Sequence, residues 1–301
     1  MSEARRSRNR PEWITLGLIA ACYALWAAAL FWLWPLFAPA GFVLAGLCIA
    51  LHSSLTHEAL HGHPFRSRAL NEALMFLPLS LAIPYGRFRD LHLAHHRDSN
   101  LTDPYDDPES NYLDPAVWDV LPQWKRRLFR INNTLLGRIL LGPGIGQARF
   151  MAGEWRRARA GQRDIVRAWL LHGAGLALLV PVLLAAPMPL WAYLAAAYLG
   201  LGLIKIRTFL EHRAHDRARG RTVIVEGRGP LAWLFLFNSL HVVHHMNPGA
   251  PWYALPRLYR DGRARYLASN DGYVYRSYGE VFRRYFWRAK DPVAHPLWQR
   301  R

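Results

Sequence analysis

The stretch HLAHH at residues 92–96, together with its near copy HVVHH at residues 241–245, decides what kind of protein this chain is. Each stretch holds three histidines at positions that fall on one side of a helix. Two further clusters, HEALHGH at 57–63 and HRAH at 212–215, bring the clustered histidines to eleven of the fourteen in the chain. Imidazole is the commonest protein ligand for transition metals, so the four clusters predict a metal site.

The best ligand candidates are the two H-x-x-H-H sets and the first cluster, whose first two histidines are four residues apart. Together they offer more imidazoles than one metal ion can use, which implies two ions. The predicted ligands are His57, His61, His92, His95, His96, His241, His244 and His245. Acidic residues beside the clusters are expected to bond the second nitrogen of a ligating imidazole. These residues are Glu58, Asp90, Asp98 and Glu211.

Four apolar runs are long enough to cross a bilayer. They cover about residues 13–34, 38–55, 165–186 and 189–206. Only a short Pro-Met-Pro turn separates the last two runs, so they form a tight hairpin. The sequence therefore predicts an all-α integral membrane protein with four transmembrane helices in two hairpins.

Two shorter apolar stretches are not counted as crossings. Residues 69–85 contain Pro78 and Pro84, which is typical of a re-entrant or interfacial segment, and residues 231–240 are too short. The segments outside the spans, about 56–164 and 207–301, are expected to form one cytoplasmic helical cap that holds the metal site, within a single membrane-bound domain.

The chain is strongly basic, and its basic residues are predicted to lie on one side of the membrane. The formal net charge is +17, yet the mean hydropathy is only −0.04. The two outward connections, at 35–41 and 186–189, carry no charge, whereas the N-terminus, residues 121–168 and the region after Arg207 are basic. This positive-inside pattern predicts that both termini and all four histidine clusters face the cytoplasm, and it argues against nucleic-acid binding.

Residues 121–145 show a separate pattern. Apolar side chains recur at helical spacing with basic residues between them, which predicts one basic amphipathic helix lying in the membrane interface. The apolar positions are Trp124, Leu128, Ile131, Leu135 and Ile139.

Two other classes of protein are alternatives to a redox enzyme. Residues 57–61 match the H-E-x-x-H motif of zinc proteases, in which Glu58 would act as the base. An intramembrane zinc protease, however, leaves both H-x-x-H-H sets unexplained. A histidine-rich metal transporter would need polar residues through its spans, and the four predicted spans contain few polar residues.

The three boxes HEALH, HLAHH and HVVHH resemble those of membrane-bound fatty acid desaturases. Alkane hydroxylases and carotenoid ketolases and hydroxylases share these boxes or close variants. The resemblance spans about residues 50 to 255, and it includes the pair Asp103-Pro104 after the second box and residues 251–256 after the third.

This resemblance implies a di-iron centre, held almost entirely by histidine, that uses O2 to attack an unactivated C–H bond. It also implies a ninth ligand just after the fourth span, which is His212, with His215 as the alternate. Animal acyl-CoA desaturases have an asparagine four residues before this histidine, where the present chain has Thr208.

The resemblance further implies a fatty acyl or other long-chain apolar substrate, contact with membrane lipid, and an external ferredoxin- or rubredoxin-like electron donor with its reductase. We expect a fatty acyl desaturase of a bacterial inner membrane. The alternatives are a hydroxylase or ketolase of a lipid, alkane or carotenoid, and an alkene-forming fatty acid decarboxylase. All of these reactions begin with the same hydrogen abstraction, so the boxes do not separate them.

Overall fold

The structure, a computed structural model, describes residues 11–97 and 101–299. The basic N-terminal residues Arg5, Arg6, Arg8 and Arg10 and the expected supporting residue Asp98 lie outside the described residues. The chain divides into two compact units. The first contains residues up to 89 and 147–203, and the second contains residues 90–146 and 204–301.

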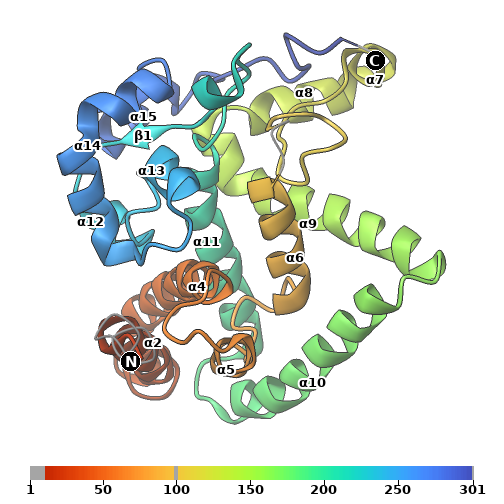
Figure 1. Ribbon diagram of the computed structural model, residues 1–301. Coiled ribbons are helices and arrows are strands. Elements are labelled where there is room, and N and C mark those ends of the chain that lie inside the picture. The colour runs from red at the N-terminus through yellow and green to blue at the C-terminus, as the bar shows by residue number, and fades with distance from the viewer. Residues whose placement is uncertain (1–10, 98–100, 300–301) are drawn as a thin grey trace. The chain divides into compact units, whose positions relative to one another are not determined.

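The first unit contains the helices that are long and apolar enough to cross a membrane (Figure 1). They are α2 (Trp13–Ala28) continued by a π-helical turn (Ala29–Leu33) and α3 (Trp34–Leu36), then α4 (Ala38–Leu60), α10 (Arg163–Ala185) and most of α11 (Leu190–Thr208). These four candidate spans confirm the four predicted ones. The second span is longer than predicted, so His57 lies inside helix α4.

Helices α4 and α11 approach each other closely because glycines face each other. A Cβ atom on Gly200 would lie 2.8 Å from the carbonyl oxygen of Gly46, and a Cβ on Gly46 would lie 2.8 Å from Leu199. Small residues allow this close packing of apolar helices where a hydrophobic driving force is weak. The crossing fixes α4, which ends in the first histidine cluster.

The predicted re-entrant stretch folds as a short helix, α5 (Arg68–Leu74), followed by irregular chain. Buried carbonyl groups in such a segment need hydrogen-bond partners, because lipid offers none. Side chains of the surrounding helices supply them: Tyr23 Oη donates to Leu74 O (2.8 Å) and Tyr193 Oη to Leu79 O (2.7 Å). Gln147 Nε2 donates to Ala82 O at 2.8 Å. The segment is therefore supported by protein and does not form a span.

The second unit contains the remaining elements, most of them short. They are α7 (Pro115–Val120), α8 (Gln123–Asn132), the 3-10 turn Ala218–Arg221, β1 (Ile224–Val225), α12 (Pro230–Leu234), α13 (His241–Met246), the 3-10 turn Trp252–Ala254, α14 (Leu255–Ser269), β2 (Val274–Tyr275) and α15 (Tyr278–Tyr285). Strands β1 and β2 pair in parallel, with Ile224 opposite Val274, and helix α13 packs against β1 and α14. The chain is mainly helical, as predicted, but this strand pair was not expected.

Three helices contain residues of both units, namely α6 (Tyr85–Arg97), α9 (Leu135–Arg159) and α11. The start of α9 corrects the sequence prediction for residues 121–145, because two helices replace the single amphipathic one. Helix α8 ends at Asn132, and Thr134 Oγ1 then accepts from the Gly137 amide at 3.0 Å. A Cβ atom on Gly137 would lie 1.8 Å from the Ile131 carbonyl oxygen, so the turn requires glycine there.

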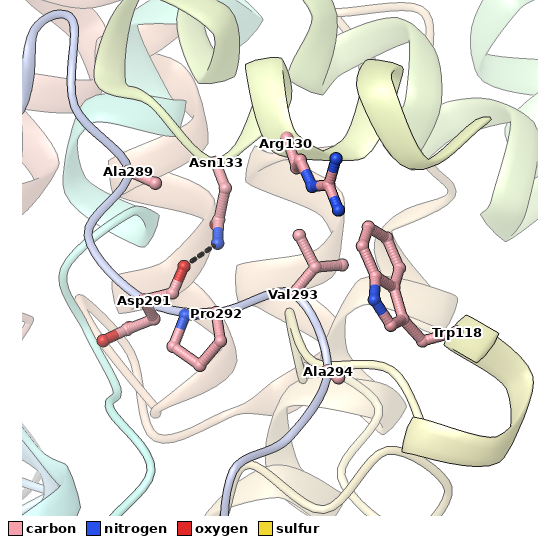
Figure 2. A pocket seen from close by; sticks show the side chains of 8 residues that line it. All are labelled: Trp118, Arg130, Asn133, Ala289, Asp291, Pro292, Val293 and Ala294. Atoms are coloured by element: carbon pink, nitrogen blue, oxygen red, sulfur yellow. Dashed lines mark hydrogen bonds between the residues drawn. The ribbon is translucent and has the colours of Figure 1, made fainter. Parts of the chain in front are cut away.

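The C-terminal segment after α15 packs against residues 113–133 of the same unit. The Leu113 amide donates to the Val293 carbonyl at 2.9 Å, and the Leu113 carbonyl accepts from the His295 amide at 2.8 Å. Asn133 Nδ2 donates to the Asp291 carbonyl at 2.5 Å. A shallow pocket of about 320 Å³ lies at this junction (Figure 2). It is lined by Trp118, Arg130, Asn133, Ala289, Asp291, Pro292, Val293 and Ala294, and none of the clustered histidines reaches it.

We predict that Tyr193→Phe destabilises the chain by about 1–3 kcal/mol, because it leaves the buried Leu79 carbonyl without its donor. Chemical unfolding of the detergent-solubilised protein measures this difference. Leu194→Met, a change on the same helix at a side chain that is 50% exposed, is the matched control and should cost less than about 0.5 kcal/mol. Equal stability of both variants would show that the re-entrant segment does not depend on this bond.

Candidate metal centre

The second unit brings three of the four histidine clusters together. The second box lies on α6 and the third on α13, while His212 follows α11 in the loop that forms a β-bridge with Thr222. Helix α13 has only six residues, and its start is set by a tight turn in which Leu236 and Phe237 both have positive φ (51° and 54°). Such strained backbone in non-glycine residues is typical of functional sites.

Four histidines form the first set, which we call the α13 set: His95, His212, His241 and His245. Their candidate ligand atoms all lie within 4.8 Å of one another. The Nε2 atoms form a chain of close approaches, at 3.0 Å from His95 to His212, 3.2 Å from His212 to His241 and 3.1 Å from His241 to His245. All four rings therefore point the same nitrogen toward one place.

Three further histidines of this unit form the α6 set: His92, His96 and His244. The Nε2 atom of His96 lies 3.0 Å from that of His92 and 3.0 Å from that of His244. The two sets are adjacent, because the rings of His96 and His245 stack with centroids 4.2 Å apart. The second unit thus holds two neighbouring groups of imidazole donors, as a dinuclear centre requires.

The opposite nitrogen of several rings is bonded by an oxygen atom. Nδ1 of His95 lies 2.8 Å from a carboxylate oxygen of Asp107, and Nδ1 of His92 lies 2.7 Å from one of Glu109. Nδ1 of His241 lies 3.1 Å from the amide oxygen of Asn238. A carboxylate or amide oxygen can only accept here, so Nδ1 carries the proton and Nε2 of the neutral ring presents a lone pair.

This arrangement fits a metal ion. Lone pairs of several neutral imidazoles that face one another at about 3 Å repel, and a cation between them removes the repulsion. Carboxylates on the far nitrogen are also the partners that metal-bound histidines commonly have. The nitrogen-only donor sets suit iron, copper, zinc or nickel and are poor sites for magnesium or calcium.

The protonation state of the two sets supports metal binding. Burial, aided by neighbouring histidines, holds the pKa values of His212, His241 and His245 well below the ordinary range. The pKa of His96 falls to about 3 for the same reasons. Burial alone would lower the pKa of His95, but the carboxylates of Glu109 and Asp107 outweigh it and raise this pKa to about 9. The rings of His96, His212, His241 and His245 are thus neutral at pH 7, whereas His95 gives up a proton when its Nε2 atom binds a metal.

The first box lies in the first unit, at the end of α4. The rings of His57 and His61 are close, with centroids 4.8 Å apart, and His57 is buried. The carboxylate of Glu58 is also buried and lies 3.6 Å from Nδ1 of His57. The third histidine of the cluster, His63, is bonded through Nδ1 to Glu12 at 2.7 Å.

The other sequence candidates occupy different places. Glu211 lies in the second unit, buried, with one oxygen 3.9 Å from Nδ1 of His241 and 2.9 Å from Arg207. Asp90 is exposed on α6. His215 lies beside Asp271 (3.3 Å), whereas His212 belongs to the α13 set.

Sequence reasoning missed the two strongest carboxylate partners, Asp107 and Glu109. They lie 12 and 17 residues after the histidines they bond, in a loop that the structure holds by hydrogen bonds to Asp107 from the amides of Thr102 (2.8 Å) and Glu109 (2.9 Å). Only the acidic run Asp-Asp-Pro-Glu at 106–109 signalled them in the sequence. Adjacency to a histidine box therefore did not identify these two residues.

Comparison with known proteins agrees with this geometry. The family model described as fatty acid desaturase matches residues 32–277, which is most of the chain. The chain belongs to the fatty acid desaturase family. Membership of this family, together with the similarity to the two relatives described next, makes the protein an oxygen-dependent oxidoreductase that acts on a lipid or another apolar substrate. The members of the family are membrane-bound, in agreement with the four candidate spans.

The chain is also similar to two curated relatives. It is 27% identical over 266 residues to a beta-carotene ketolase of Paracoccus sp. (strain PC1), a match that covers 83% of this chain and 93% of that protein. It is 28% identical over 259 residues to a beta-carotene ketolase of Paracoccus sp. (strain N81106 / MBIC 01143), covering 80% and 88%. Both relatives belong to the same superfamily.

We predict that Asp107→Asn and Glu109→Gln each weaken metal binding by about 10- to 100-fold, because each removes the charge that orients one imidazole and raises its basicity. Competition with a chelator, followed by elemental analysis, measures this loss. Asp106→Asn is the matched control, since Asp106 is exposed in the same loop. If the control variant lost as much metal as Asp107→Asn, the loop fold rather than the hydrogen bonds would be responsible.

The metal-free chain should lose stability as the pH falls. The pKa of His96 is about 3 in the folded chain against an ordinary 6.5, so its stabilising contribution is complete above pH 6.5 and is lost as the pH falls toward 3. His95 acts in the opposite sense, and its contribution is lost as the pH rises through about 9. Unfolding midpoints of the metal-free protein between pH 4 and pH 7 test this. His96→Gln should flatten the acid limb, and an unchanged limb would contradict the assignment.

Proposed function

We propose that the chain is a di-iron, O2-dependent oxidase that converts a ring methylene of a carotenoid into a ketone. One observation carries the redox part of this proposal: two adjacent sets of imidazoles whose Nε2 atoms converge while oxygen atoms bond several of their Nδ1 atoms. Similarity to two beta-carotene ketolases over four-fifths of the chain supports the substrate class. The carotenoid substrate class is inferred from this similarity alone.

The proposed ligands are nine histidines, shared between two iron ions. The α13 set and the α6 set supply seven of them, and His57 and His61 of the first box are proposed as the other two from their sequence spacing and the proximity of their rings. When bound, the iron pair supplies the activation of O2 and the cleavage of a C–H bond. Neutral donors leave such a pair electron-poor, which favours oxidation of an alkyl carbon.

The residues of this chain have three tasks in that reaction. The imidazoles bind the metal, while Asp107, Glu109 and Asn238 fix which nitrogen faces it. Glu211 and Glu58 are proposed as further support close to His241 and His57. Asp90, which is exposed, has a weaker case for this role.

The stoichiometry requires a partner. Conversion of CH2 to C=O in two oxygenation rounds consumes two O2, four electrons and four protons and yields three H2O. The chain shows no flavin, haem or nucleotide motif, so an external ferredoxin- or rubredoxin-like protein with its reductase is proposed as the donor. The positive-inside charge pattern supports a cytoplasmic site and cytoplasmic termini in a bacterial inner membrane.

Fatty acyl desaturation is the second candidate, favoured by the description of the matching family. It consumes one O2, two electrons and two protons and yields one double bond and two H2O. Hydroxylation of a lipid or alkane and decarboxylation of a fatty acid to an alkene use the same first step. The zinc protease built on His57, Glu58 and His61, the alternative from another class, disagrees with membership of the fatty acid desaturase family.

Product analysis separates these candidates. Cells that make β-carotene and express the chain with a ferredoxin–reductase pair should accumulate a ring ketone, measured by mass spectrometry, while acyl-chain unsaturation stays unchanged. A new acyl double bond, alcohol or terminal alkene without a ketone would contradict the ketolase proposal and identify the alternative.

Ligand substitutions test the centre itself. We expect His95→Ala and His244→Ala to abolish turnover and lower iron content, because each removes a donor from a different set. His212→Ala should behave in the same way. His215→Ala is the matched control and should retain iron and activity, since His215 lies beside Asp271 instead. Full activity of both His95→Ala and His244→Ala would refute the di-iron proposal.

A further inference from the structure

The first unit carries a second feature, an arginine cluster where α9 ends and α10 begins. Between residues 147 and 170 the chain has six arginines and only two acidic residues. We call the arginines at 149, 156, 157, 159, 163 and 167 the α9–α10 cluster. The turn between these helices is seen in Figure 1. This cluster plays no part in the metal centre described above.

Within residues 11–97 and 101–299, acidic side chains neutralise only a small part of the charge of the cluster. One of the two acids, Glu154, is buried and already bonded by the Arg87 guanidinium in two places, at 2.7 and 3.0 Å. It lies 4.0 Å from Arg157, while the other acid, Asp164, is exposed. By contrast, four exposed arginines of α14 and α15 form ion pairs with acids, as Arg257 does with Asp261 at 3.6 Å. Six arginines against one exposed acid and one acid already bonded by Arg87 leave the α9–α10 cluster with an excess of positive charge, which calls for an anionic partner.

The position of the cluster identifies the depth at which that partner lies. Helix α10 is a candidate membrane span, and its charged residues are confined to its first turns. Along its exposed side Arg163 and Arg167 are followed by Leu170 (70% exposed) and Leu178 (60% exposed). A helix that presents cations and then only exposed apolar side chains passes from lipid headgroups into lipid tails.

Exposed apolar side chains also lie among the arginines on α9. Trp155 is 66% exposed, and the Arg159 guanidinium lies over its ring at 5.8 Å. Met151, one turn earlier, is 42% exposed. An indole beside cations is typical of the boundary between headgroups and acyl chains, whereas a binding face for a soluble acidic protein has no need of exposed leucines continuing from it.

We propose that the α9–α10 cluster is a binding site for the phosphate headgroups of anionic phospholipids. Arg156, Arg159, Arg163 and Arg167 contact the phosphates, and Trp155 lies at the level of the glycerol. The site recruits such lipids to the start of α10, and the fixed, always-charged guanidinium groups suit phosphate oxygens better than a diffuse charge would. This inference does not depend on the reaction that the metal centre catalyses.

Lipid selectivity of the full-length protein in vesicles tests the site. Vesicles contain phosphatidylcholine and phosphatidylglycerol in equal parts, with bromine on the acyl chains of one lipid at a time, and tryptophan quenching reports which lipid contacts the protein. The Trp155→Phe difference isolates the local signal. We expect a preference for phosphatidylglycerol of at least about fivefold around Trp155. Replacement of Arg156, Arg159, Arg163 and Arg167 by Gln should bring this preference close to one.

Two control variants and one competitor keep the proposal falsifiable. The same four positions changed to Lys should keep most of the preference, which also shows that the segment still folds. Changing Arg257, Arg260, Arg265 and Arg276 to Gln alters the net charge equally and should leave the preference near Trp155 unchanged. An equal loss in that control would overturn the proposal. It would also be overturned if inorganic phosphate abolished the preference more than chloride at the same ionic strength, since the ligand would then be a free anion.

Discussion

The hydrogen bonds from Asp107 to His95 and from Glu109 to His92 are the constraint on which the site depends. An imidazole can turn either nitrogen toward a metal, and its partner on the far side decides which one. In each of these pairs the carboxylate holds Nδ1 in the protonated form, so Nε2 faces the neighbouring rings. Asn238 does the same for His241 with a neutral amide. Without these contacts, the histidines would be a cluster of polar rings with no common direction.

The fold supplies the positions that make those bonds possible. Helix α6 presents three histidines on one side, and the strained turn before α13 lets a six-residue helix present three more. The tail contributes as well, because Lys290 donates to the His212 carbonyl at 3.2 Å. In the first unit, the glycine crossing of α4 and α11 and the side-chain donors around Leu79 let an irregular segment lie among apolar helices. The carbonyl groups of Leu79 and His212 are thus each bonded by a side chain from a distant part of the sequence.

Patterns that repeat locally were readable from the sequence, and contacts between distant loops were not. Apolar length predicted all four spans, since crossing a bilayer fixes the number of residues, and the box spacing predicted sets of histidines on common helix faces. The break between α8 and α9 was missed because it depends on the close approach of Gly137 to Ile131, which helical periodicity does not record. Asp107 and Glu109 were missed because the loop returns them to α6 from 12 and 17 residues away. The short parallel strand pair depends on a register between residues 50 apart, which no local pattern encodes.

A di-iron centre is tested most directly by the metal content of the purified full-length protein, combined with X-ray absorption at the iron edge. We expect two iron ions per chain, each surrounded mainly by nitrogen ligands, because two adjacent histidine sets converge through Nε2. One zinc ion per chain, or an iron shell dominated by oxygen, would contradict it.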